Sequence, residues 1–293
     1  MTHHDEYSNP TLQLLMRRAS CRSYSDRPVP PEILQQVLDA GIHAPTAGNL
    51  QPYSIIKIES PETRQRLAEL CGRQSFVAEA PVNLLFCIDW HRVERWTQFE
   101  IAPFTASSSF RCFWFALQDT VIAAQAMSTA ADSLGLGSVY VGMVLECLAE
   151  LRDLLKLPPG VLPVVLLCLG YPAKRSQPAR KLGTRVVVHD ETYRDLPDEE
   201  LADAFDEKYR GREREITEER LENIYEVCRE VHGAEFAEEC ADRMRTSGYI
   251  GAAQTYFGLI YPANTIPRGN EVFLQTIEEL GLNCFKPWEG AGD

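Results

Sequence analysis

Residues Arg17-Arg18-Ala19-Ser20-Cys21-Arg22-Ser23-Tyr24 form the most informative stretch of this chain. Arg18, Ser20 and Arg22 stand two positions apart, and alternate side chains of an extended chain point the same way. Two guanidinium groups and a hydroxyl on one face make an anion site, because arginine binds phosphate oxygens through paired hydrogen bonds. The same alternation puts Cys21 on the opposite face, where we expect it to be buried. A solvated polar edge is the alternative that this stretch alone leaves open.

The charge of the whole chain makes this basic cluster an exception. The 293 residues carry a formal net charge of −13, and the sequence pI is near 5.0. Such a chain repels nucleic acid and anionic lipid, so we expect neither nucleic acid nor a membrane among its partners. Apolar residues make up 45% and charged residues 24%, the composition of an ordinary globular protein.

Nine cysteines are spread along the chain, an odd number with no C-x-x-C spacing. This pattern argues against a zinc ribbon, a thioredoxin-like site and a disulfide framework. The polar segment Met1–Pro10 lacks the apolar run of a secretory signal, so we expect a reduced, cytoplasmic protein. None of the six histidines has metal-ligand spacing, and no metal site is expected.

A second segment, Ala44-Pro45-Thr46-Ala47-Gly48-Asn49-Leu50-Gln51-Pro52-Tyr53, presents small groups, amides and a hydroxyl in a loop before a strand. Amide side chains both donate and accept hydrogen bonds, which suits the edge of a heterocyclic ring. A plain turn is the alternative, since proline, glycine and asparagine are ordinary turn residues.

Two further segments carry weaker signals. Leu134–Gly142 holds three glycines without the dinucleotide fingerprint, because the last stands five positions after the second and the segment follows a helix. A glycine after a strand still lets a planar ligand approach the backbone closely. The adjacent cations Arg180 and Lys181 follow a predicted strand and are candidates to complete a phosphate site.

Hydrophobic periodicity predicts alternating helices and strands over the first two thirds of the chain. Helices are expected at residues 11–18, 31–43, 61–70, 113–134 and 148–155. Strands are expected at residues 53–58, 82–88, 139–141 and 164–171, with a last extended piece at 185–189. Residues 90–111 show no clean period and are expected to form an inserted loop.

The remainder of the chain has a different character. Residues 198–245 hold 17 Asp/Glu against 8 Lys/Arg, and their apolar residues follow a helical period. We therefore place a boundary near Leu196-Pro197. It separates a core of residues 1–196 from an acidic helical C-terminal extension of residues 197–293.

Five segments, in this order, resemble the motifs of the FMN-dependent nitroreductase family. They are Arg18–Tyr24, Pro28–Leu34, Ala44–Tyr53, Ser133–Gly142 and Leu169–Pro172, and the resemblance covers about residues 12–196. It implies an α+β fold, a three-layer α-β-α sandwich of nitroreductase type with a mixed, mostly antiparallel sheet and a C-terminal helical extension. It also implies a homodimer that binds FMN tightly between its subunits, with the helix at 113–134 near the interface.

The resemblance assigns candidate FMN-binding residues by position. Arg18 and Ser20 match the contacts to the phosphate and the ribityl chain. Arg22 matches the cation beside the pyrimidine edge of the flavin, where it stabilises an anionic reduced ring. Arg180 and Lys181 fall where the family places its last phosphate cations.

Two loops supply the other matched residues. One is the loop that the family delivers from the second subunit, and its matched residues are Pro45, Thr46, Asn49 and Gln51. The other is the strand end at Val141, Gly142 and Met143, whose backbone N–H faces flavin N5. No protein side chain is expected to act as a catalytic acid or base, because the chemistry belongs to the flavin.

The activity that the resemblance implies is an NAD(P)H-dependent oxidoreductase. NAD(P)H reduces the flavin and leaves, and an electron-poor small molecule then takes the electrons in a ping-pong cycle. Nitroaromatics, quinones and enones are acceptors of this kind. Two alternatives stay open: a specialised flavin enzyme on the same fold, reductive dehalogenase-like or flavin-fragmenting, and a non-catalytic flavin-binding protein whose acidic tail docks a partner.

Overall fold

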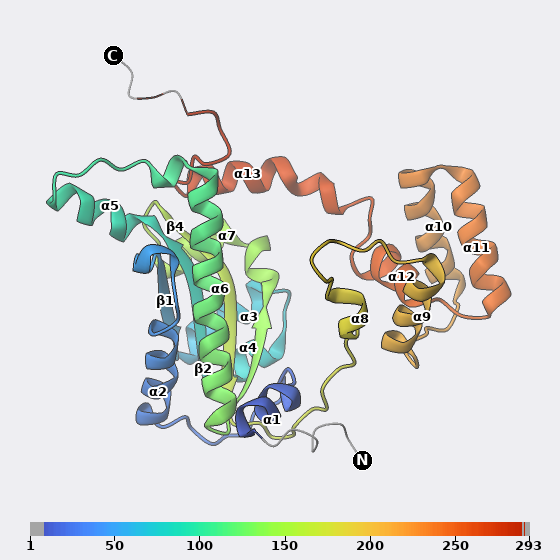
Figure 1. The fold of residues 1–293 in the computed structure, drawn as a ribbon, viewed down its shortest axis with the longest axis horizontal. Coiled ribbons are helices and arrows are strands. Elements are labelled where there is room, and N and C mark those ends of the chain that lie inside the picture. The colour runs from blue at the N-terminus through green and yellow to red at the C-terminus, as the bar shows by residue number, and fades with distance from the viewer. Residues whose placement is uncertain (1–8, 289, 291–293) are drawn as a thin grey trace. The chain divides into compact units, whose positions relative to one another are not determined.

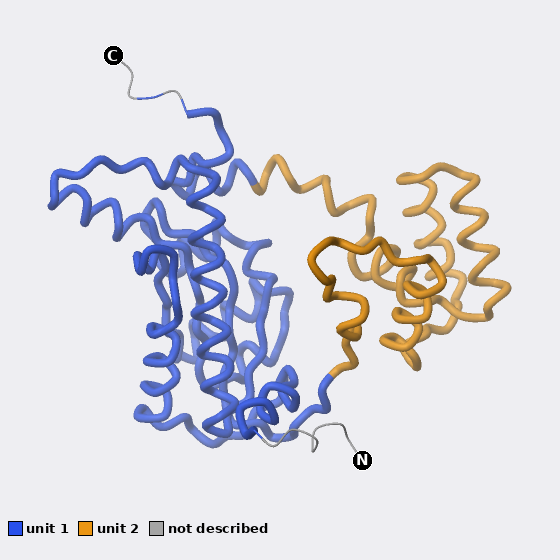
Figure 2. Tube along the Cα trace, viewed as in Figure 1, with its two compact units in different colours: residues 1–178, 274–293 blue, residues 179–273 orange. Residues whose placement is uncertain are grey.

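The computed structural model describes residues 9–288 and 290, and the chain divides into two units (Figures 1 and 2). Unit 1 comprises residues 1–178 and 274–293, and unit 2 comprises residues 179–273. Unit 2 is therefore an insertion in the chain of unit 1. The boundary expected near Leu196-Pro197 falls inside unit 2. The last residues belong to unit 1 because Ile277 and Leu282 are buried in one cluster with Ile88.

A four-stranded sheet of order β1-β2-β4-β3 forms the middle of unit 1. The strands are β1 (Tyr53–Ile58), β2 (Val82–Asp89), β3 (Gly137–Val141) and β4 (Val161–Gly170). All three strand pairs are antiparallel. The four-stranded sheet is therefore antiparallel throughout, whereas a mixed, mostly antiparallel sheet was predicted; an isolated parallel bridge joins Ser20, outside the named strands, to Ser138 of β3.

Helices cover both faces of this sheet, which confirms the predicted three-layer α-β-α sandwich (Figure 1). Successive side chains of a strand point to opposite faces. Leu85 and Cys87 of β2 accordingly pack on α3 (Pro61–Leu70), α4 (Ser75–Glu79) and α7 (Leu148–Leu155). Leu84 and Phe86 pack on the other side against α2 (Pro31–Ile42) and α6 (Phe110–Ser133).

The long helix α6 runs along one face of the sheet (Figure 1). It packs closely on α2 because Gly41 has no side chain: a Cβ there would lie 2.1 Å from Cε of Met127. Elsewhere α6 leaves large apolar side chains 41–49% exposed, namely Phe110, Trp114, Phe115, Val121 and Ile122. Among the described residues, neither α6 nor any other helix is long and apolar enough to cross a membrane.

Two of the predicted elements are wrong. Residues 90–111 are not a loop: they contain α5 (Trp90–Phe99), which begins where the Asp89 carboxylate accepts the Arg92 N–H at 2.9 Å. Trp90 and Val93 are buried, and this burial holds the helix on unit 1. The expected extended piece at 185–189 contains the helical turn α8 (Thr184–Val187), because its backbone hydrogen bonds are local rather than to a neighbouring strand.

The remaining helix of unit 1 at the N-terminal side is α1 (Pro10–Arg17), which Asn9 caps by accepting two backbone N–H groups. At the other end of the chain, α13 (Asn270–Glu279) begins in unit 2 and ends in unit 1. The backbone N–H of Gly160 donates to the carbonyl of Leu280 at 2.7 Å, which fixes the returning chain beside the start of β4.

Unit 2 is helical, as predicted for the acidic segment. It contains α9 (Asp198–Tyr209), α10 (Glu218–His232), α11 (Ala234–Ser247), α12 (Ala252–Thr255), a π-helical turn (Tyr256–Ile260) and a 3-10 turn (Ile266–Gly269). Gly233, with φ 91°, makes the tight turn between α10 and α11. Their shared core includes Leu221, Ile224, Met244 and Ile250.

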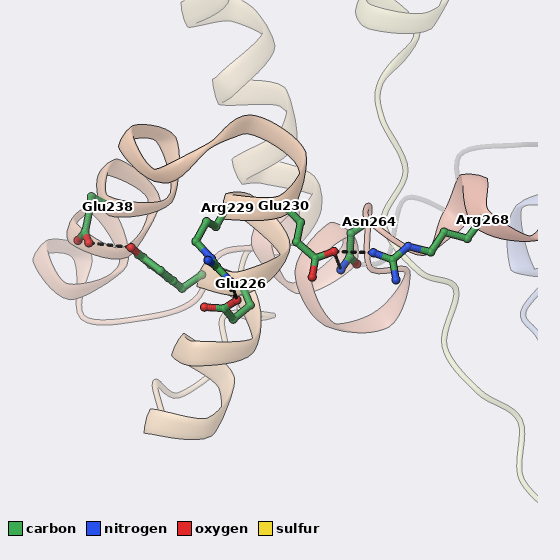
Figure 3. Close-up of polar contacts among 7 residues, drawn as sticks. Glu226, Arg229, Glu230, Glu238, Asn264 and Arg268 are labelled. Atoms are coloured by element: carbon green, nitrogen blue, oxygen red, sulfur yellow. Dashed lines mark hydrogen bonds and ion pairs between the residues drawn. The ribbon is translucent and has the colours of Figure 1, made fainter.

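Exposed polar contacts link the elements of unit 2 (Figure 3). The Tyr225 hydroxyl donates to Glu238 at 2.8 Å and so joins α10 to α11. Glu230 accepts from Asn264 at 2.9 Å and pairs with Arg268 at 2.5 Å. The hydrogen bond from Asn264, followed by the charge of Arg268, lowers the pKa of Glu230. These contacts tie α10 to the segment that leads into the 3-10 turn.

Candidate functional site

A pocket of ≈ 550 Å³ lies in unit 1 beside the start of β3. Arg18, the C-cap of α1, lines it together with Arg17 and Arg175. Asp132 of α6 is the one acidic residue of the lining. Three arginines against one aspartate make this pocket cationic in a chain whose net charge is −13.

Arg18 contributes the most informative group of this pocket. Its Nε and Nη2 atoms are buried and have no hydrogen-bond partner. Its guanidinium carbon lies 5.6 Å from the centre of the Tyr140 ring, which orients the planar group. A buried charged donor without a partner is costly, so the site is complete only when an anion accepts from these nitrogens. The forked geometry suits a phosphate group.

Asp132 does not satisfy Arg18. No ion pair joins the two side chains, and the Asp132 Oδ2 atom is itself buried without a partner. Burial raises the pKa of Asp132, while the charges of Arg18 and Arg175 act in the opposite direction. Arg175 donates to the carbonyl oxygen of Gly135 at 3.2 Å and so closes the pocket on the side of the α6–β3 turn.

The chain after α1 is extended, as predicted, and Ala19 and Cys21 line the pocket whereas Ser20 does not. Ser20 forms the parallel bridge to Ser138 of β3, and the Cys21 N–H donates to the Ser138 carbonyl at 2.9 Å. Cys21 is only 5% exposed, which confirms its predicted burial. Burial raises the pKa of the Cys21 thiol, and its Sγ lies 3.3 Å from the Ser23 carbonyl oxygen. It is therefore a packing residue rather than a nucleophile.

The other end of β3 carries the second group of predicted residues. Val141 ends the strand and is buried, whereas Gly142 and Met143 begin a 3-10 turn, and the Met143 side chain is 40% exposed. Val141 lies three positions after Ser138, which places it about 10 Å further along the strand. The exposed Arg22 lies with its guanidinium carbon 5.9 Å from the Phe76 ring centre on α4.

The loop that contains Pro45, Thr46, Asn49 and Gln51 has a strained but well-anchored backbone. Gly48, Asn49 and Gln51 all have positive φ angles, of 59°, 55° and 53°. Such conformations are costly for non-glycine residues and tend to persist at functional sites. Asp119 of α6, 4% exposed, accepts the Ala47 N–H at 3.1 Å and 3.2 Å with its two oxygens. Burial raises the pKa of Asp119, and the Ala47 hydrogen bond opposes that shift.

Helix α5 holds the end of the same loop. The Arg92 Nη2 atom donates to the carbonyl oxygens of Gln51 at 2.8 Å and Tyr53 at 2.6 Å. The Gln51 amide donates to the Ile42 carbonyl at 2.9 Å. Side-chain contacts from α5 and α6 therefore fix the loop where it enters β1.

A single chain does not bring this loop to the Arg18 pocket. None of Pro45, Thr46, Asn49 and Gln51 lines that pocket. The loop enters β1, and β1 and β3 are the opposite edges of the sheet, three strand spacings or about 14 Å apart. The anchors on α6 agree, since Asp119 and Asp132 are 13 positions or about 20 Å apart along the helix.

Arg180 and Lys181 belong to unit 2, where the Arg180 Nη1 atom donates to the Arg210 carbonyl at 2.8 Å. Sequence reasoning missed Asp119, Asp132 and Arg175. The first two had a signal, because they are the only charged residues between positions 112 and 134 of an otherwise apolar and small-residue helix. Arg175 had a weaker one, as a cation shortly after a predicted strand.

The family model described as Nitroreductase family matches residues 15–171, more than half of the chain. The chain belongs to this family. The FMN reductase (NAD(P)H) of Bacillus subtilis is 31% identical over 242 residues, covering 79% of this chain and 97% of that protein. The oxygen-insensitive NADPH nitroreductase of Salmonella typhimurium is 34% identical over 200 residues, covering 68% and 81%.

Solved structures agree with the sandwich described above. The B. megaterium protein NfrA2 superposes with a TM-score of 0.72 at 25% identity, covering 95% of this chain and all of its own. The NADPH:FMN oxidoreductase of Vibrio harveyi, solved with NAD+, gives a TM-score of 0.63 at 30% identity, covering 68% of this chain and 84% of its own. The predicted nitroreductase-type fold is thereby confirmed.

Proposed function

We propose that this nitroreductase-family protein is an FMN-dependent oxidoreductase that uses NAD(P)H to reduce small electron-poor acceptors. The observation that carries the proposal is the pair of buried, partnerless nitrogens of Arg18. The phosphate of FMN is an acceptor that fits them, and the Ser20 hydroxyl lies on the same extended segment. The names of the relatives, an FMN reductase and an NADPH nitroreductase, support this cofactor and this reductant.

The chain's own residues bind and orient the cofactor. FMN, when bound, supplies the hydride-transfer chemistry. Arg18 and Ser20 hold its phosphate end, and Arg22 offers a cation to the pyrimidine edge of the ring. The assignment of Arg180 and Lys181 to the phosphate, which the family resemblance implies, stays a prediction.

The backbone after β3 completes the proposed binding surface. Val141, Gly142 and Met143 provide a backbone edge for the flavin ring, and Gly142 leaves that edge open because no atom lies within 4 Å of its ideal Cβ position. In this proposal no side chain of the protein acts as a catalytic acid or base, because FMN supplies the hydride-transfer chemistry.

The active form in this proposal is a homodimer with FMN between its subunits. The loop with Pro45, Thr46, Asn49 and Gln51 is held at the sheet edge opposite the Arg18 pocket, so a second chain is the natural source of the loop at each pocket. The exposed apolar side chains of α6 supply a surface of the kind that subunit interfaces cover.

The acceptors proposed are nitroaromatics, quinones and enones, which take electrons readily and need no proton donor fixed in the protein. We place the enzyme in the cytoplasm. All nine cysteines are free thiols, which supports a reducing compartment.

The test is an anaerobic absorption spectrum of the purified, FMN-loaded protein before and after NADH or NADPH. We expect the flavin band to bleach. Arg18→Ala should raise the dissociation constant of FMN about tenfold or more, since a hydrogen bond to a charged group contributes about 1.5–3 kcal/mol.

Arg66→Ala is the matched control, because Arg66 makes only an exposed ion pair with Glu69 on α3. The control should bind FMN as the unmodified protein does. Equal FMN affinity in Arg18→Ala and Arg66→Ala would show that the phosphate site lies elsewhere. A flavin band that resists both nucleotides would exclude the reductase activity.

A further inference from the structure

Unit 2 contains a groove of its own, with a volume of ≈ 1000 Å³. Aromatic side chains from two elements line it: Phe205 and Tyr209 of α9, and Tyr256 and Phe257 of the π-helical turn. Tyr261, just after that turn, is a further lining residue. The volume is at the upper end of the range for small-molecule sites.

The rings are arranged in a continuous series. Phe205 and Tyr209 lie 6.2 Å apart with planes 6° from parallel, and Tyr209 lies 5.6 Å from Tyr256. Tyr256 and Tyr261 follow at 6.5 Å, with planes 5° from parallel. The side chains of Phe257 and Tyr261 remain 59% and 58% exposed. Unit 2 has a hydrophobic core of its own, and these two rings are not part of it. Exposed aromatic side chains that gather in one place mark a binding surface.

The π-helical turn gives this wall its shape. A π turn is rare and is frequently found at functional sites. Gly258 allows it to lie on α10, since a Cβ there would be 2.7 Å from Cγ1 of Ile224. A glycine therefore stands where the turn that presents Tyr256 and Phe257 meets the core of the unit.

Of the arginines that the structure describes in unit 2, some are paired with acidic side chains and others are not, and two of the unpaired ones line the groove. Arg229 and Arg268 pair with acidic neighbours (Figure 3). Within the described part of the chain, neither Arg210 nor Arg243 forms an ion pair, although 17 acidic residues lie between positions 198 and 245. Both line the groove.

The groove also contains two acidic side chains, one of which is held by the backbone. Asp206 and Glu213 also line it. Glu213 is engaged by the backbone, accepting the Gly211 N–H at 3.2 Å. Lys208 adds a further cation, its Nζ atom 4.8 Å from the centre of the Tyr209 ring. Cationic groups beside aromatic rings fit a ligand that is both flat and negatively charged.

We infer that this groove binds a planar aromatic anion of one or two rings that carries a carboxylate, sulfonate or phosphate group. Its ring stacks on Tyr209 and Tyr256, and its charged group accepts hydrogen bonds from Arg243 and Arg210. This is a second site, built from unit 2 alone and independent of the Arg18 pocket and of the proposed reductase activity.

Isothermal titration calorimetry on the FMN-loaded full chain tests this inference, with naphthalene-2-sulfonate as the probe. We expect one saturable site beyond the flavin, and at least fivefold weaker binding of the neutral analogue 2-naphthol. Arg243→Ala and Tyr209→Ala should each weaken sulfonate binding at least fivefold. Tyr209→Phe keeps the ring face and should bind as the unmodified chain does, which separates lost stacking from a damaged fold.

Arg245→Ala is the control for charge, because Arg245 is on the same helix, pairs with Asp242 and does not line the groove. Its sulfonate affinity should be unchanged. The rate of NAD(P)H oxidation should be unchanged in all of these variants, so a failure of the groove and a failure of the reductase proposal are distinguishable. Absence of sulfonate binding, or binding that Arg243→Ala and Tyr209→Ala both leave intact, would overturn the inference.

Discussion

Both units carry exposed ion pairs, but unit 1 also buries charged groups at two places. In unit 1, Asp119 is buried with a single backbone partner, and two buried nitrogens of Arg18 have none. In unit 2, Glu226 and Glu230 are exposed and paired with arginines. Water and salt weaken exposed pairs, whereas a buried charge keeps most of its electrostatic cost and reach. Charged side chains that are buried or unpaired are therefore better candidates for a functional role than exposed, paired ones.

The largest expected effect tests whether the two units unfold independently of each other. Phe86 of β2 is fully buried between α2 and α6, so Phe86→Ala should cost unit 1 about 3–5 kcal/mol. Calorimetric unfolding should show the unit 1 transition moved down and the unit 2 transition in place. Ile224→Ala, in the core of unit 2, is the mirror-image control. Equal movement of both transitions in either variant would break the comparison.

A smaller effect is expected at the anchor of the loop. Asp119→Ala leaves the Ala47 N–H without its acceptor, and a buried donor in that state costs about 1–3 kcal/mol. We expect NAD(P)H oxidation to fall several-fold, while the global unfolding midpoint of unit 1 changes little. Asp119→Asn keeps an acceptor oxygen and should retain most of the activity. Full activity in Asp119→Ala would show that the loop does not need this anchor.

The effect of replacing Asp132 is expected to depend on pH. Removing its negative charge beside Arg18 should strengthen FMN binding a few-fold, because like charges repel in a partly buried pocket. Burial raises the pKa of Asp132 above its ordinary 3.8, so the carboxylate takes up a proton at a higher pH than an exposed aspartate does. The advantage of Asp132→Asn therefore shrinks as the pH is lowered.

The measurement is the ratio of FMN dissociation constants for the unmodified chain and Asp132→Asn between pH 7 and pH 4. The phosphate itself titrates in both proteins and cancels in the ratio. The linkage sign also predicts that the unmodified chain gains stability relative to Asp132→Asn as the pH is lowered, since the buried carboxylate costs least when protonated. A ratio that stays constant with pH would mean that Asp132 does not face the bound anion.

The smallest effect is expected in unit 2. Glu230→Gln removes the ion pair with Arg268 and weakens the contact with Asn264, yet both acidic oxygens are near water. We expect the unit 2 unfolding midpoint to equal that of the unmodified chain within error, at low and high salt alike. A loss of several degrees that salt abolishes would show that surface pairs do carry this unit.

The local sequence pattern was sufficient to predict those helices and strands whose burial follows from their own residues. The apolar run of β2 and the helix at 148–155 were predicted within a residue or two, and the predicted burial of Cys21 is confirmed. It failed at α5, because Trp90 and Val93 are buried against Leu280 and Leu282, nearly 200 positions away. No window of neighbouring residues contains that information.

The sequence supplied candidate residues for the site but not their arrangement in space. The motif around Arg18 and the loop around Asn49 were both identified from sequence. Only the strand order shows that they belong to opposite edges of one sheet. Asp119 and Arg92, which hold the backbone of this loop, were missed for a related reason. A side chain that binds a backbone segment far away in the sequence has no characteristic sequence motif around it.

The return of the chain to unit 1 has a consequence for how the molecule comes apart. Because residues 274–293 complete a core that also contains Trp90, a protease that cuts between the units near residue 178 yields two fragments that share one hydrophobic cluster. Such a nicked protein stays together without a covalent bond until it is denatured. Two cuts, one in each connection, are needed to free the helical insert, so a nick alone is a poor sign of where one folding unit ends.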